Sequence, residues 1–132
     1  MGLPSKKIIN FNFMEDKIMF TELTVNGETY QLRLTTRTSV QLEKALGFNP
    51  LDILIAMEDG KMPKLSDCLI ILQYMLLSMN HGFNADKTMD LYDSYIAEGH
   101  TMLELIPIFM DVFKDSGYLN EDATATEESA KN

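Results

Sequence analysis

The sequence has 132 residues, and 20 acidic residues against 11 basic ones give a formal net charge of −9. A hydrophobic fraction of 45% at this length predicts one domain with its own core, which needs neither a metal nor a disulfide to fold. The acidic balance argues against a nucleic-acid partner, the single cysteine excludes an intramolecular disulfide, and no apolar run is long enough to span a membrane.

The N-terminal part of the chain predicts a small antiparallel sheet. The pair Asn26-Gly27 lies between two runs of alternating apolar residues, which is the strongest short-range pattern for a β-hairpin. A two-residue turn at this pair places Val25 opposite Glu28 and gathers six side chains on one apolar face: Met19, Leu23, Val25, Tyr30, Leu32 and Leu34. A further strand is indicated by three apolar residues that alternate with asparagine: Ile9, Phe11 and Phe13. Such a one-sided sheet needs helices to cover it, and the outer edge of the hairpin is a candidate for strand pairing with another subunit.

After the hairpin, the pattern is that of helices separated by glycines. Asn49-Pro50 is typical of a helix start, Ser66 or Asp67 is expected to cap the next helix, and Asn84 the one after that. Together with a final helix, the expected set covers about residues 38–46, 50–59, 66–80, 85–98 and 102–115.

The final helix carries two further signals. Thr101 and Glu104 have the spacing of a capping box, in which the threonine side chain and the glutamate side chain each bond a backbone N–H at the helix start. Pro107 lies inside this helix, so we expect either a kink or a delayed start.

These elements predict an α+β fold that is mostly α, with an N-terminal hairpin packed on about five helices. Residues 18–119 are expected to form one globular domain. Residues 1–17 are expected to be an extension, either an extra strand or partly foreign to the natural protein. Residues 120–132 (NEDATATEESAKN) hold no large apolar side chain and are expected to be a disordered acidic tail.

Two of the expected helices are apolar on nearly every side. They cover Leu65 to Met79 and residues 102–113, and only a narrow polar seam interrupts the first of them. A helix of this kind is usually buried on most sides. Two interpretations remain open: a central pair of core helices, or an apolar groove that a partner fills.

The residues that could carry chemistry form no recognisable catalytic or metal-binding pattern. His81 and His100 stand beside glycines at expected helix ends, and Cys68 lies in an apolar helix, where it is expected to be an inert small hydrophobe. Three aspartates share one face of a helix without the spacing of a calcium loop, and are expected to be a solvated acidic face: Asp86, Asp90 and Asp93. We therefore expect no catalytic residue, no metal site and no cofactor.

The order of three segments resembles a known family. The runs LTVNGETYQLRLTTRTSVQLEKALGFNPLDIL, LSDCLIILQYMLLSMNHGFN and LYDSYIAEGHTMLELIPIFMDVFKDSGYL are similar to the small tail assembly chaperones of siphophages and prophages of low-GC Gram-positive bacteria. The similarity covers about residues 20–119 and includes His81-Gly82 and Leu105-Ile106-Pro107. It rests on the ordered combination, since each motif alone is common.

The resemblance implies a function without catalysis in the cytoplasm of the bacterial host. Such proteins bind the long, hydrophobic, helical tape-measure protein, keep it soluble and help to recruit major tail tube subunits around it. They are absent from the mature virion, and a longer frameshifted form often accompanies the short one.

For the docking of the client, we expect an amphipathic helix to lie in a groove between the two apolar helices. The expected contact residues, each of which could instead be ordinary core, are Tyr74, Leu77, Ile106, Phe109, Met110 and Phe113. The same apolar excess could serve a homo-oligomer. Two alternatives of other classes stay open: a structural tail-completion or connector protein retained in the virion, and a small enzyme or regulator with a ligand pocket.

Overall fold

The hairpin forms with the register that its sequence predicts. In the computed structural model, which describes residues 6–10 and 17–120, strand β2 (Lys17–Val25) pairs antiparallel with β3 (Glu28–Leu32). Val25 lies opposite Glu28, and Asn26 and Gly27 form the turn with positive φ angles of 55° and 76°. A two-residue turn of this kind requires positive φ at both positions, which asparagine and glycine tolerate best.

A third strand, β1 (Lys6–Asn10), pairs antiparallel with β2, so that the sheet has the order β1-β2-β3. Of the three residues that indicated an additional strand, Ile9 lies in β1, opposite Ile18. Phe11 and Phe13 lie outside the described residues.

The free edge of β3 is partly closed by the end of a helix. The backbone N–H of Arg33 donates to the carbonyl of Met75 over 3.1 Å, and the Asn80 side chain donates to the carbonyl of Gln31 over 2.8 Å. An added strand would need these outward-facing backbone groups, which already have partners. Strand pairing with another subunit is therefore disfavoured at this edge.

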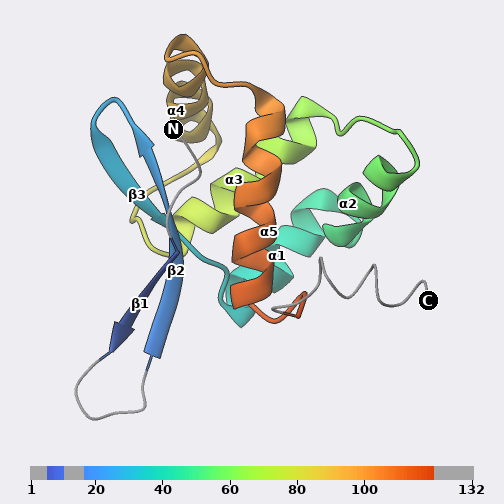
Figure 1. Cartoon of the computed structure of the whole chain (residues 1–132), viewed down its shortest axis with the longest axis horizontal. Coiled ribbons are helices and arrows are strands. Elements are labelled where there is room, and N and C mark those ends of the chain that lie inside the picture. The colour runs from blue at the N-terminus through green and yellow to red at the C-terminus, as the bar shows by residue number, and fades with distance from the viewer. Residues whose placement is uncertain (1–5, 11–16, 121–132) are drawn as a thin grey trace.

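The described residues form five α-helices, which makes the fold α+β and mostly α, as the sequence predicts (Figure 1). Their bounds are α1 (Thr36–Leu46), α2 (Leu51–Glu58), α3 (Leu65–Leu77), α4 (Ala85–Ala97) and α5 (Leu105–Asp115), the last preceded by a short 3₁₀ helix, η1 (Met102–Glu104).

One of the expected helix starts is correct, and a second is shifted by one residue. The side chain of Asn84 accepts a bond from the N–H of Lys87 over 2.8 Å and caps α4. At α2, Pro50 is the N-cap residue and the helix begins at Leu51, although the side chain of Asn49 accepts from the N–H of Leu51 over 2.9 Å.

Two other expected caps are wrong. Neither Ser66 nor Asp67 caps α3, which begins at Leu65 without a side-chain cap. Thr101 is the N-cap residue of η1, but its side chain makes no capping bond, and the carboxylate of Glu104 bonds the Nδ1 of His100 over 2.8 Å, so no capping box forms. The residues after Thr101 form η1, and α5 begins only at Leu105, so the start of the helix is delayed as Pro107 predicts.

The core lies between the sheet and the two apolar helices. Leu23, Val25 and Leu32 of the hairpin are at most 5% exposed and pack with buried residues of α3 and α5. Helices α1 and α4 pack against α3, and α5 contacts β2 (Figure 1). The structure therefore shows α3 and α5 as central core helices, the first of the two interpretations.

The hairpin tip and the C-terminal end are fastened to helices by side-chain bonds. The N–H of Asn26 donates to the carboxylate of Glu98 over 2.5 Å, which ties the turn to the end of α4. The hydroxyl of Tyr118 donates to the carboxylate of Glu43 over 2.6 Å, which ties the segment after α5 to α1.

Candidate partner-binding surface

The six residues expected to contact a client do not form one exposed surface. Ile106, Phe109 and Phe113 are only 7%, 1% and 1% exposed, because this side of α5 faces the sheet and α3. The other three expected contacts, Tyr74, Leu77 and Met110, are half-buried. The expectation that α5 offers Phe109 and Phe113 to a partner is therefore corrected: in this fold their rings belong to the core.

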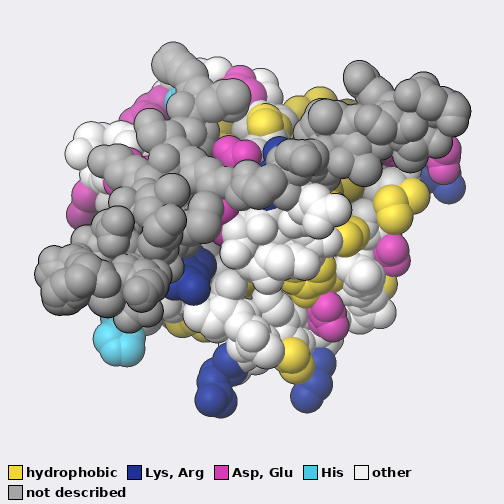
Figure 2. All heavy atoms as spheres, turned by 60° about the horizontal axis from the view of Figure 1, so that its bottom comes forward, with side chains coloured by type: hydrophobic (Ala, Val, Ile, Leu, Met, Phe, Trp, Pro, Cys, Tyr) yellow, Lys and Arg dark blue, Asp and Glu magenta, His cyan; other side chains and the backbone are white. Residues whose placement is uncertain are grey.

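Exposed apolar side chains gather instead around α2. Phe48, Ile55, Met62 and Leu65 are 36%, 58%, 62% and 44% exposed, and all belong to α2, to the loops beside it or to the first turn of α3. Helix α2 lies on the side of the molecule away from the sheet (Figure 1). Figure 2 shows hydrophobic side chains among charged ones on that same right-hand side.

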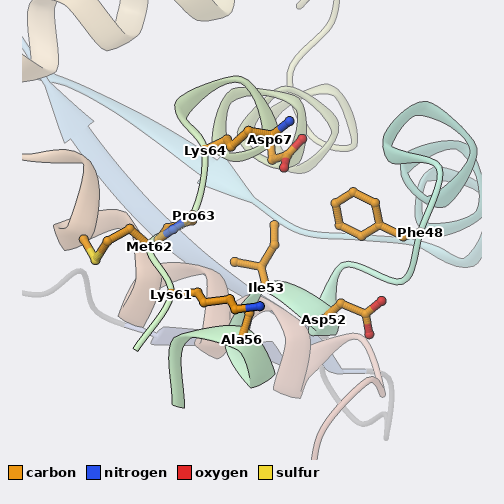
Figure 3. A pocket seen from close by; sticks show the side chains of 9 residues that line it. All are labelled: Phe48, Asp52, Ile53, Ala56, Lys61, Met62, Pro63, Lys64 and Asp67. Carbon is orange, nitrogen blue, oxygen red and sulfur yellow. The ribbon is translucent and has the colours of Figure 1, made fainter. Parts of the chain in front are cut away.

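A hollow of about 220 Å³ opens beside α2, and we call it the α2 hollow. Its walls come from the loop before α2, from α2 itself, from the loop after it and from the start of α3 (Figure 3). Nine residues line it: Phe48, Asp52, Ile53, Ala56, Lys61, Met62, Pro63, Lys64 and Asp67.

Local turns on either side of α2 create the hollow. Gly47 ends α1 with a φ of 85°, and α2 begins after Pro50. Phe48 therefore lies in the short loop between the two helices. Gly60 then ends α2 with a φ of 86°, a left-handed conformation in which a side chain is strained. The chain turns back at this point, and the loop from Lys61 to Lys64 forms one wall of the hollow.

The hollow has an apolar interior and a charged rim. In Figure 3 the ring of Phe48 and the side chain of Met62 stand on opposite sides, with Ile53 between them. Lys64 and Asp67 lie on one wall, and Lys61 and Asp52 lie on the other. Neither aspartate has an ion-pair partner among the residues that the structure describes. Apolar interiors with polar rims are typical of interaction surfaces.

Two titratable groups outside the hollow, those of Cys68 and Tyr95, are buried in the core. Cys68 is fully buried, and burial, with a smaller effect of the neighbouring Asp67 carboxylate, raises the pKa of its thiol to about 11, so the thiol stays protonated at neutral pH. His100 stacks on Tyr95 with 4.5 Å between ring centroids, and burial, followed by the charge of Glu104, raises the pKa of the Tyr95 hydroxyl to about 12.

The acidic residues of α4 are arranged as the sequence indicates. Asp86, Asp90 and Asp93 are all exposed. Within residues 6–10 and 17–120, no three histidine, cysteine or acidic side chains converge where a metal ion could be held. No helix among the described residues has both the length and the apolar character needed to cross a bilayer.

Sequence reasoning missed the α2 hollow because it ranked helices by total apolar content. That measure selects α3 and α5, whose side chains fill the core. The available signal was different: α2 (LDILIAME) is apolar on more than one side, and an isolated Met62 stands in a short polar loop directly after it.

Comparison with known proteins places the chain in a family. A family model described as a family of unknown function (DUF6096) matches residues 18–131, and the chain belongs to this family. The matched region starts in β2 and contains all the described helices. Neither the curated proteins nor the solved structures gave a match.

Proposed function

We propose that the chain is a non-catalytic phage tail assembly chaperone, which binds the hydrophobic tape-measure protein, keeps it soluble and helps to recruit tail-tube subunits. The proposal starts from the ordered resemblance over about residues 20–119. It places the protein in the bacterial host cytoplasm and outside the mature virion.

The observation that carries the proposal is the α2 hollow. The buried residues of α3 and α5 are used by the core, whereas Phe48 and Met62 are exposed apolar side chains that lie together at a hollow. A hydrophobic helical client needs such a surface, because a helix binds by laying its apolar face into an apolar groove or hollow. This moves the client site away from the α3 and α5 residues that apolarity alone selected.

Co-expression with a helical, apolar fragment of the tape-measure protein tests the proposal directly. We expect the fragment to stay in the soluble fraction with the wild-type chain and to return to the pellet with the double variant Phe48→Ser, Met62→Ser. A matched control is the double variant Met89→Ser, Leu103→Ser, which changes side chains that are 44% and 40% exposed on α4 and η1.

Circular dichroism of each variant separates lost binding from lost folding. A fragment that stays insoluble with equal amounts of folded wild-type chain would refute the chaperone function. The alternative, a tail-completion or connector protein, predicts that mass spectrometry finds the chain in purified virions. The proposed function predicts its absence there, and a gene placed between those of a major tail protein and a very long helical protein.

A further inference from the structure

We propose that Asn26 is a site of spontaneous deamidation, and that Glu98 sets the rate of this reaction by holding the hairpin turn closed. The proposal concerns a covalent change of the chain itself and does not depend on the proposed function. Three features of the turn carry it: its sequence, its exposure and its hydrogen bond to the end of α4.

The sequence at the turn is the one in which an asparagine side chain reacts most readily. Asn26 is the one asparagine of the chain that is followed by glycine, and both residues are exposed. The backbone nitrogen of the following residue is the nucleophile, and glycine has no Cβ to hinder its approach or its rotation. Asn49, by contrast, precedes Pro50, whose backbone nitrogen carries no hydrogen and cannot react in this way.

The reaction needs no partner other than water. The Gly27 nitrogen loses its proton and attacks the Cγ of Asn26, the new C–N bond closes a succinimide ring, and the side-chain nitrogen leaves as ammonia. Water then breaks one of the two ring C–N bonds. Cleavage at Cγ gives aspartate at position 26, and cleavage at the backbone carbonyl gives isoaspartate, in which the main chain runs through the former side chain and is one carbon longer.

The folded turn opposes ring closure. The φ angles of Asn26 and Gly27 are 55° and 76°, as in a two-residue turn of type I′. In such a turn the ψ of the first residue is about +30°, which places the Gly27 nitrogen on the side of the Cα–C bond away from the Cβ of Asn26. The nitrogen reaches Cγ only after Asn26 leaves this conformation, so the reaction passes through an opened turn.

Glu98 keeps the turn closed from outside the hairpin. Its carboxylate accepts the N–H of Asn26 over 2.5 Å, and Glu98 is the residue at which α4 ends. The turn between β2 and β3 accordingly lies beside α4 (Figure 1). A hydrogen bond from a backbone N–H to a carboxylate is charge-assisted, and opening of the turn breaks it. The bond therefore lowers the population of the open, reactive turn.

The products loosen the same contact. A carboxylate at position 26 stands beside the carboxylate of Glu98, and the two like charges repel. The extra backbone carbon of isoaspartate does not fit a two-residue turn, whose geometry fixes the register of β2 and β3. Deamidation thus releases the tip of the hairpin from α4.

Ageing of the full chain at 37 °C and pH 8 tests the proposal. Peptide mapping, with enzymatic methylation of isoaspartate as the readout, gives the rate at each asparagine. We expect product at position 26 first and none at Asn49, and a faster reaction at position 26 when the chain is unfolded in urea. Glu98→Ala should raise the rate at position 26 of the folded chain by about fivefold, because it removes the bond that closes the turn.

Two further variants of α4 separate the bond from the charge. Glu98→Gln keeps an acceptor oxygen without the charge, and its rate should stay within about twofold of the wild-type rate. Asp93→Ala removes an exposed carboxylate of the same helix and should also stay within about twofold. Circular dichroism must show that each variant is folded.

Three outcomes of the ageing experiment would overturn the proposal. They are the absence of product at position 26 in urea, equal rates for folded Glu98→Ala and wild type, and a Glu98→Gln rate as high as that of Glu98→Ala, which would assign the effect to charge. Hydrogen exchange of the isoaspartate form, isolated by ion exchange, tests the release. The amides of Thr24 and Glu28 should exchange at least about fivefold faster than in the unaged chain, and unchanged exchange would refute the release of the hairpin tip.

Discussion

Replacing Phe109 with alanine measures whether α5 belongs to the core or to a docking groove. The ring is 1% exposed and packs among the buried residues of the central cluster. Removing a buried phenylalanine ring costs about 3–5 kcal/mol, from lost transfer free energy and from the cavity left behind. The free energy of unfolding of a domain is about 5–15 kcal/mol, so this single change removes roughly a fifth or more of it.

Urea unfolding followed by far-ultraviolet circular dichroism gives the number. With a urea dependence of about 2 kcal/mol per molar, the midpoint of Phe109→Ala should fall by about 1.5–2.5 M. Met62→Ala is the matched control, because its side chain is 62% exposed, and its free energy of unfolding should change by less than about 0.5 kcal/mol. A loss below about 1 kcal/mol for Phe109→Ala would show that the ring is not packed, and would return α5 to the list of client-binding surfaces.

Three further predictions concern stability. Thr21→Val should raise the free energy of unfolding, measured in urea, by about 1–2 kcal/mol, because the Thr21 hydroxyl is fully buried without a hydrogen-bond partner among the described residues. Thr24→Val, at an exposed site of the same strand, should change the free energy of unfolding far less. Asn84→Ala should cost about 1 kcal/mol in the same assay, since it removes the cap of α4, and an unchanged midpoint would contradict the capping role. Burial, with the hydrogen bond to Glu43, raises the pKa of Tyr118 to about 12 from its usual 10.0. The folded state thus favours the protonated phenol, and this contribution to stability should be complete below pH 10 and lost as the pH rises towards about 12. An ultraviolet titration of the wild-type chain and one of Tyr118→Phe should therefore differ in that range. A difference between the two titrations that is centred near pH 10 would refute the argument.

Local chemistry decided which parts of the fold the sequence could predict. The register around Asn26-Gly27 depends on two residues whose backbone preferences are strong and on alternation within the adjoining strands. The cap at Asn84 is also local, because donor and acceptor are three residues apart. Such features depend little on the rest of the chain, so sequence reasoning finds them.

Side-chain contacts decided the parts of the fold that the sequence could not predict. Helix α3 was expected to reach Asn80, but it ends at Leu77, and the Asn80 side chain bonds the carbonyl of Gln31 in β3, 49 residues away. No capping box forms at Thr101, and the Glu104 side chain bonds His100, four residues before it, whose ring stacks on Tyr95. No local pattern contains the contact between Asn80 and Gln31.

The burial of the expected contact residues could not be predicted from the sequence for a related reason. Phe109 and Phe113 were chosen because they are apolar, yet apolarity is the property that core residues and client-binding residues share. What separates the two classes is whether the rest of the chain covers them. For Met62 that depends on the turn at Gly60, which returns the chain beside α2 without burying the methionine.

The acidic charge of the chain offsets one consequence of the exposed apolar side chains at the α2 hollow. An exposed apolar surface invites self-association. A net charge of −9 on each copy opposes that encounter over the distance at which charges act. Helix α2 has eight residues, of which only Ile53 is buried, while Leu51, Leu54 and Met57 are partly buried against the core. The proposed chaperone function would need a surface of this kind, at which a client contacts α2 while α3 and α5 stay in the core.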